Sequence, residues 1–299
     1  MTKRADTPGN DNKSAHKKSH KHIKRAISNT LAYLLLSIGA FISLIPFIWM
    51  ISTSLKARTE VFAFPPTFIP TTLRWDNYTN VFSSFPFFSY MRNTAVVAVS
   101  VTLLQLMVSA SAAFAFSRME FKGRNLLFFL FLGTMMVPYQ VTEIPAYIMM
   151  TDKFLGLKGS LLSLILPGGL GGVAFGTFML RQFMLGIPRE LDEAALMDGA
   201  SPLKIFFRII LPLSKPGLAT LAVFTFMGSW NDFLWPLLML DKPELQTLTV
   251  GLATLQTRWG TRWPEMMAGS LVSIIPILII TLIAQKYLVK GLAVTGLKG

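Results

Sequence analysis

The chain of 299 residues is 52% hydrophobic, only 14% charged, and carries a formal net charge of +13. Because soluble domains contain roughly 25% charged residues, this composition predicts a protein embedded in a lipid bilayer. There is no cysteine and all three histidines lie in the first 22 residues, which excludes disulfides, thiolate metal sites and a Ser-His-Asp triad and leaves no support for an enzyme, a metal centre or a resident cofactor.

Residues 1–30 form a basic tail with eight lysines and arginines, and the charge then stops at an apolar run. A basic segment beside a first membrane span places that end on the cytoplasmic side. We therefore interpret residues 1–30 as a disordered cytoplasmic tail that orients the protein and can also contact anionic lipids. This clustering explains the high net charge without a nucleic-acid partner.

Six apolar segments are long enough to be membrane spans, because a helix needs about 20 apolar residues to cross a bilayer. Prolines at positions 138, 167, 236 and 276 interrupt the last four, which is tolerated where neighbouring helices satisfy the freed carbonyl groups. The sequence thus predicts an all-α membrane protein with six transmembrane helices, at residues 31–51, 91–116, 126–150, 160–184, 213–238 and 268–290.

The charge distribution orients these spans. With a cytoplasmic start, residues 117–125, 185–212 and 291–299 lie inside, and 19 of the 28 lysines and arginines fall on that side against 9 outside. This bias follows the positive-inside rule and predicts that both termini are cytoplasmic. We expect a first unit at 31–90, a core of five helices at 91–290, and a cytoplasmic tail after it.

Two outer segments are rich in aromatic residues and proline. Residues 52–90 contain many of both, and residues 239–267 contain Trp259, Trp263 and Pro264. Aromatic side chains favour the boundary between membrane and water. We therefore expect structured loops that pack there.

The long inner segment 185–212 begins with a short predicted helix. Pro188 suits its first turn, and Glu190, Asp192 and Glu193 suit the positive end of its dipole.

A second short helix follows a turn. Gly199 permits the left-handed conformation that ends a helix, Ser201 can cap the next one, and Pro202 suits its first position. Pro212 is expected to end it. The result is a helical hairpin that lies along the membrane.

Small side chains at Ala194, Ala195 and Gly199 leave room for close approach by another protein, and the acidic residues beside them can pair with its cations. The alternative is an ordinary amphipathic loop that stabilises the bundle.

The pattern Glu193-Ala194-Ala195, then Gly199, then Leu211-Pro212 resembles the coupling motif of the membrane subunits of binding-protein-dependent ABC importers. The resemblance implies the type I ABC importer permease fold, with a cytoplasmic coupling helix that fits a groove on a separate ATP-binding subunit. It assigns this ATPase-coupling role to Glu193, Ala194, Ala195, Asp198, Gly199 and Pro212.

Four further segments are similar to the carbohydrate-uptake branch of that family, and within it to the maltose-type second permease. The similarity implies a pseudo-symmetric heterodimer with a homologous permease, two ATP-binding subunits, an extracytoplasmic solute-binding protein and a sugar substrate. It also implies that the end of the chain contacts the ATP-binding subunit. The segments are Asp76-Asn77-Tyr78, Arg92-Asn93-Thr94, Trp230 to Pro236, and Gly291-Leu292 with Gly296 to Gly299.

Polar side chains inside the spans suggest a substrate path, because a charge at the centre of a span costs about 2.5–3.5 kcal/mol on insertion scales. Sugars suit aromatic faces combined with carboxylate and amide groups. Alternatively, Asn231 and Asp232 cap or cross-link helices and Glu143 reaches outer water. The candidates are Gln105, Tyr139, Glu143, Trp230, Asn231 and Asp232.

Gly168, Gly172 and Gly176 recur every fourth residue in the fourth span. This spacing is typical of close helix packing, and the alternative is a flexible gate after Pro167.

The chain lacks the phosphate-binding motif Gly-x-x-x-x-Gly-Lys-Ser/Thr, so ATP hydrolysis belongs to another polypeptide. It also lacks a relay of charges through several spans. The sequence therefore predicts the permease subunit of an ATP-driven sugar importer that works by alternating access. The alternatives are an ABC permease for a non-sugar solute such as glycerol phosphate, and an ion-coupled secondary carrier.

Overall fold

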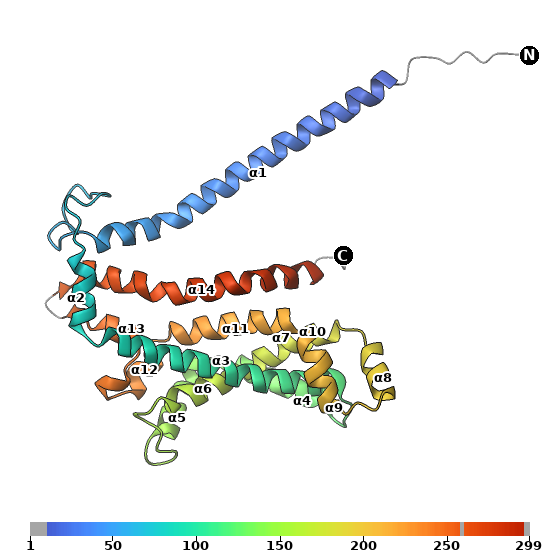
Figure 1. Ribbon diagram of the computed structural model, residues 1–299. Coiled ribbons are helices and arrows are strands. Elements are labelled where there is room, and N and C mark those ends of the chain that lie inside the picture. Colours follow the sequence, from blue (N-terminus) through green and yellow to red (C-terminus); the bar gives the residue numbers. More distant parts are fainter. Residues whose placement is uncertain (1–10, 258–259, 296–299) are drawn as a thin grey trace, which may run out of the picture.

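The computed structural model describes residues 11–257 and 260–295 (Figure 1). Within this part the chain is helical apart from connecting loops and two short strands. In chain order the elements are α1 (Asp11–Ser54), α2 (Asp76–Ser84), α3 (Phe87–Arg118), α4 (Arg124–Gly133), the 3-10 turn η1 (Thr134–Met136), α5 (Tyr139–Met150), α6 (Leu162–Gly171), α7 (Val173–Leu185), α8 (Glu190–Met197), α9 (Pro202–Ile205), the π-helical turn η2 (Phe206–Ile210), α10 (Leu211–Leu213), α11 (Lys215–Trp230), α12 (Leu234–Met239), the 3-10 turn η3 (Pro243–Leu245), α13 (Leu248–Ala253), β1 (Gln256–Thr257), β2 (Gly260–Thr261) and α14 (Trp263–Thr295).

Three of the described helices are long and apolar enough to cross a membrane: α1 over Ser28–Ser54, α3, and α14 over Trp263–Lys286. Three bent pairs also qualify: Arg124–Met136 with α5 (93°), α6 with α7 (42°), and Pro202–Leu213 with α11 (75°). Counting each pair as one span gives up to six. The predicted all-α class is therefore confirmed; β1 and β2 add only one antiparallel hairpin, with Gln256 opposite Thr261.

A proline inside one helix frees a carbonyl group that a side chain of another helix binds. Pro167 lies inside α6 and cannot donate to Ser163, so the Ser163 carbonyl accepts the indole N–H of Trp235 at 2.9 Å. Just before α12, the Asp232 carbonyl accepts the hydroxyl of Thr249 at 2.6 Å. These bonds join α12 to its neighbours, and the fourth span bends at Gly172 instead of at its proline.

α1 begins at Asp11, so the basic tail that the sequence predicted to be disordered is helical from that residue onward. Lysine and alanine are good helix formers, and a helix already nucleated in the apolar segment extends at little cost. At its other end α1 meets α14, but most of α1 diverges from the bundle (Figure 1), and Leu36 on it is 69% exposed.

The bundle is built around α3, which packs along α6, α7 and α11 (Figure 1). Apolar clusters surround it at three levels. One cluster joins α3 to α2, α13 and α14, a second joins it to α6 and α12, and a third joins it to α7, α9, η2 and α11. The α8–α9 hairpin, residues 190–213, lies beside the third cluster, at the same end of the bundle as the end of α14 (Figure 1).

Two asparagines of the segments that carry the family resemblance fix loops at the opposite end. Asn77 donates to the carbonyl oxygens of Ser54 and Lys56, both at 2.9 Å, and so caps the end of α1. Asn93 donates to the carbonyl oxygens of Glu244 and Gln246. The roles of these two residues are therefore structural.

Candidate functional site

The α8–α9 hairpin has the local structure that its sequence predicted in most details. Glu190, Asp192 and Glu193 occupy the first turn of α8. Gly199 follows α8 in the left-handed conformation, with φ of 75°. Ser201 then caps α9, with its hydroxyl 3.4 Å from the backbone N of Lys204.

Two prolines differ from the prediction. Pro188 lies two residues before α8 instead of in its first turn. Pro212 does not end the second helix, because the chain widens into the π turn η2, where the N–H of Leu211 bonds the carbonyl of Phe206. The wider turn accommodates the proline ring, which would clash with the Arg208 carbonyl in an α-helix. The helix ends at Ser214, where the chain turns by 75° into α11.

Arg118 at the end of α3 attaches the hairpin to the bundle, a role that its sequence context did not predict. Its guanidinium contacts Asp192 of α8 at 2.9 Å and donates to the carbonyl oxygens of Met184 (2.6 Å) and Ile187 (2.8 Å). The side chain is 5% exposed. Asp192 is therefore occupied inside this chain and does not face a partner.

The two alanines of the motif point in different directions. Ala195 packs against the apolar cluster of α3, α7 and η2, whereas Ala194 and Glu193 are exposed. The surface beside them is more apolar than the predicted acidic corner, because Leu196 is 54% and Met197 89% exposed.

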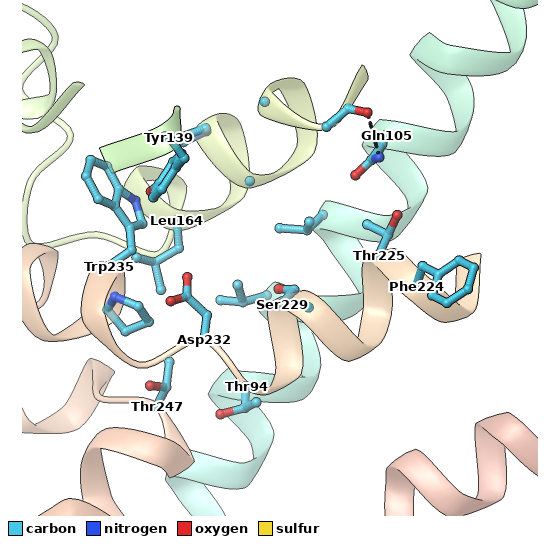
Figure 2. Close-up of a pocket in the computed structure, with 18 of the residues that line it drawn as sticks. Thr94, Gln105, Tyr139, Leu164, Phe224, Thr225, Ser229, Asp232, Trp235 and Thr247 are labelled. Carbon is cyan, nitrogen blue, oxygen red and sulfur yellow. Dashed lines mark hydrogen bonds between the residues drawn. The ribbon is translucent and has the colours of Figure 1, made fainter. Parts of the chain in front are cut away.

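A cavity of about 420 Å³, called here the central cavity, lies where α3, α6, α7, α11 and α12 meet the start of α5 (Figure 2). Its size falls within the range of small-molecule sites. Three of the sequence-predicted path residues line it: Gln105, Tyr139 and Asp232.

Asp232 reaches the cavity because α11 ends at Trp230 and α12 starts only at Leu234. In the turn between them, its carboxylate lies near the backbone N–H groups of Phe233 and Trp235. Asp232 therefore stands just before α12, and its carboxylate faces the cavity (Figure 2).

Two aromatic rings also line the cavity. Tyr139 at the start of α5 meets Trp235 edge to face, with ring centroids 6.5 Å apart. One turn along α5, Glu143 lies close enough for its charge to act on both Asp232 and Tyr139. One Glu143 carboxylate oxygen is buried without a hydrogen-bond partner in the described chain, while the residue as a whole is half-buried.

Gln105 of α3 donates its amide to the Gly172 carbonyl at 2.9 Å, at the bend between α6 and α7 (Figure 2). Glycines let these helices approach α3: an added Cβ at Gly169 would lie 2.6 Å from Leu104, and one at Gly176 would lie 2.4 Å from Ser109. Close packing is thus shown, and the bend lies on the cavity wall.

Trp230 and Asn231 do not line the central cavity. Trp230 is 3% exposed, points toward α14 and donates its indole N–H to the Ser273 carbonyl at 3.1 Å. Asn231 donates to the carbonyl of Met227, one turn back on its own helix. The predicted contact of Gly296 to Gly299 falls outside the described residues.

Comparison with known proteins places this arrangement among transporters. Residues 76–294 match the family described as binding-protein-dependent transport system inner membrane component, which spans α2 to nearly the end of α14. The chain is 36% identical to the arabinooligosaccharides transport system permease protein AraQ of Halalkalibacterium halodurans, over 93% of this chain and 100% of that protein. It is also 36% identical to the sn-glycerol-3-phosphate transport system permease protein UgpE of Escherichia coli, over 87% and 94%.

One solved structure is similar over nearly the whole chain. It is a chain of a bacterial ABC transporter involved in the import of the acidic polysaccharide alginate, with a TM-score of 0.76 and 26% identity. The similarity covers 89% of this chain and 98% of that one.

Proposed function

Because the chain belongs to the family of inner membrane components of binding-protein-dependent transport systems, we propose that it is the permease subunit of an ATP-driven importer. Its substrate is a sugar, specifically an oligosaccharide, which it moves across the cytoplasmic membrane. One observation carries the proposal: the same helices that line the central cavity also hold the α8–α9 hairpin. Movement of the hairpin can thus reach the cavity through rigid elements.

The coupling step is assigned to the α8–α9 hairpin. Glu193, Ala194 and Asp198 are exposed and face the ATP-binding subunit, with Met197 as an apolar anchor beside them. Ala195 packs the hairpin against the bundle, and Gly199 provides the turn between its helices. The π turn before Pro212 and the bend at Ser214 pass its movement to α11, so closure of the ATP-binding subunits opens and closes the cavity by alternating access.

The substrate path is assigned to the central cavity. Asp232 accepts sugar hydroxyls, Tyr139 and Trp235 offer aromatic surface, and Glu143 adds a second carboxylate. Gln105 acts by holding the bend at Gly172. Trp230 and Asn231 act only through the turn that presents Asp232.

The partners follow from the family and from surfaces left uncovered. A homologous permease completes the path as a pseudo-symmetric heterodimer, two ATP-binding subunits supply the energy, and an extracytoplasmic binding protein delivers the sugar. Lipid and the second permease cover the apolar surface of α1. The end of α14 and the α8–α9 hairpin lie at one end of the bundle (Figure 1), and we place this end and both termini in the cytoplasm.

A second candidate substrate is glycerol phosphate, favoured by the 36% identity to UgpE. An ion-coupled secondary carrier is a third, more distant candidate, and such a protein would work without ATP-binding subunits.

The test is uptake by the complete complex, copurified with its partner subunits and reconstituted in liposomes. Arabinotriose should enter only with ATP inside the liposomes and binding protein outside, and Glu193→Lys should abolish uptake without loss of the complex. Entry driven by an ion gradient in the absence of the ATP-binding subunits would contradict the proposal, and ATP-dependent entry of sn-glycerol-3-phosphate alone would replace the substrate.

A further inference from the structure

Building on the transport function proposed above, we propose that Asp232 and Glu143 make the central cavity select neutral, hydroxyl-rich solutes and reject anions. The class of substrate would then be a neutral saccharide.

The described residues that line the central cavity include no lysine, arginine or histidine. Asp232 is the one carboxylate among them, and Glu143 lies near enough to interact with it. In the loop before α6, Lys158 already pairs with Asp241 at 3.0 Å. Hydrogen bonds to Tyr147 and Asp241 raise the pKa of Lys158 and keep it charged. The negative charge of Asp241 offsets this positive charge outside the cavity. The field inside the cavity is therefore negative.

The hydrogen-bonding groups are suited to hydroxyls. The carboxylate of Asp232 faces the cavity (Figure 2), and no cation stands beside it among the described lining residues, so its oxygens can accept hydrogen bonds from a solute. Thr225 and Ser229, one turn apart on α11, add hydroxyls to the same wall (Figure 2). A neutral saccharide offers many donors to these groups, whereas a phosphate or carboxylate would face like charge.

The expected discrimination is large. For two unit charges about 8 Å apart at an effective dielectric constant of about 20, repulsion lowers occupancy on the order of tenfold to a hundredfold. The relatives include carriers named for anionic solutes, sn-glycerol-3-phosphate and alginate. The negative charge of the central cavity disfavours those two anionic solutes and favours a neutral one.

The absence of cysteine allows a direct measurement of the field. In the assembled complex, Ser229→Cys introduces one thiol into this chain at the cavity wall. Its reaction rates with cationic (trimethylammonium) and anionic (sulfonate) methanethiosulfonates are followed by mass spectrometry of this subunit. Free N-acetylcysteine gives the reference ratio, and Thr225→Cys serves as a second reporter position.

We expect the cation-to-anion rate ratio of the thiol in the Ser229→Cys variant to exceed the reference at least about tenfold. Adding Asp232→Asn should lower this ratio about tenfold, whereas adding Asp152→Asn, which neutralises an exposed carboxylate outside the cavity lining, should leave it unchanged. A ratio equal to the reference at both reporter positions, or one insensitive to Asp232→Asn, would overturn the inference. If instead the ratio holds but no solute is transported, the selectivity stands and the proposed function fails.

Discussion

Replacing Arg118 with alanine should release the α8–α9 hairpin from the bundle. The 5% exposed guanidinium serves three acceptors, the Asp192 carboxylate and two carbonyl groups. Breaking a buried ion pair from one side costs about 3–5 kcal/mol. Because Asp192 is itself 16% exposed and can be rehydrated, we take the lower value of about 3 kcal/mol, which reduces the attached population of α8 about a hundredfold.

The measurement is hydrogen exchange of the α8 amides in the assembled complex, together with the ratio of solute uptake to ATP hydrolysis. Exchange over residues 190–197 should accelerate about a hundredfold, and uptake should fall while ATP hydrolysis persists. Arg118→Lys should behave similarly, because one ammonium group cannot reproduce the planar fork of the guanidinium.

The matched control is Arg189→Ala. Arg189 and its partner Glu120 are 53% and 83% exposed and 3.8 Å apart, so this pair contributes about 0–1 kcal/mol. Wild-type protection of α8 in the Arg118→Ala variant, or equal effects of the two substitutions, would refute the tether.

Three further changes test the other parts. Gly199→Pro should abolish uptake while membrane insertion persists, because proline cannot adopt φ of 75°; uptake and membrane content are measured together. Asp232→Asn should slow sugar uptake about tenfold in the same assay, since it loses a charged acceptor worth about 1.5 kcal/mol or more. Gly176→Ala should destabilise the bundle by about 1–3 kcal/mol, seen as a lower melting temperature, because its Cβ would lie 2.4 Å from Ser109. Gly171→Ala, with open space around its added Cβ, is the control.

Each of these changes has an outcome that contradicts its reasoning. Normal uptake by Gly199→Pro would remove the hairpin from the coupling path. Unaltered kinetics in Asp232→Asn would remove Asp232 from the substrate path. Equal melting temperatures for the two alanine substitutions would mean that the α3–α7 contact relaxes freely.

The membrane spans and the hairpin could be predicted because their signals are local. Runs of apolar residues predicted the long helices, and Gly199, Ser201 and Pro202 predicted the turn inside the hairpin. Each of these residues acts through its own backbone conformation or through a neighbour within three or four positions. Pro212 failed as a helix end because a π turn can accommodate a proline, and that choice depends on the packing of η2 against α3 and α7.

The contents of the cavity were predictable only in part, because they depend on which way each helix faces. Asp232, Tyr139 and Gln105 come together there, but Trp230, two residues before Asp232, points toward α14. From the sequence, Arg118 indicates only a positive charge at the inner end of a span. Its partner Asp192 lies 74 residues further along the chain, so nothing in the local sequence links the two.

The isolation of α1 has a consequence for which substitutions the protein tolerates. Over Ser28–Ser54 the most apolar stretch of this helix buries none of its residues within the chain. A shorter side chain there leaves no cavity inside this chain. The chain itself therefore requires a hydrophobic side chain at these positions but not one of a particular shape. Any stricter demand on the residues of α1 must come from molecules outside the chain, whereas the demand for a small residue at Gly176 comes from the fold itself.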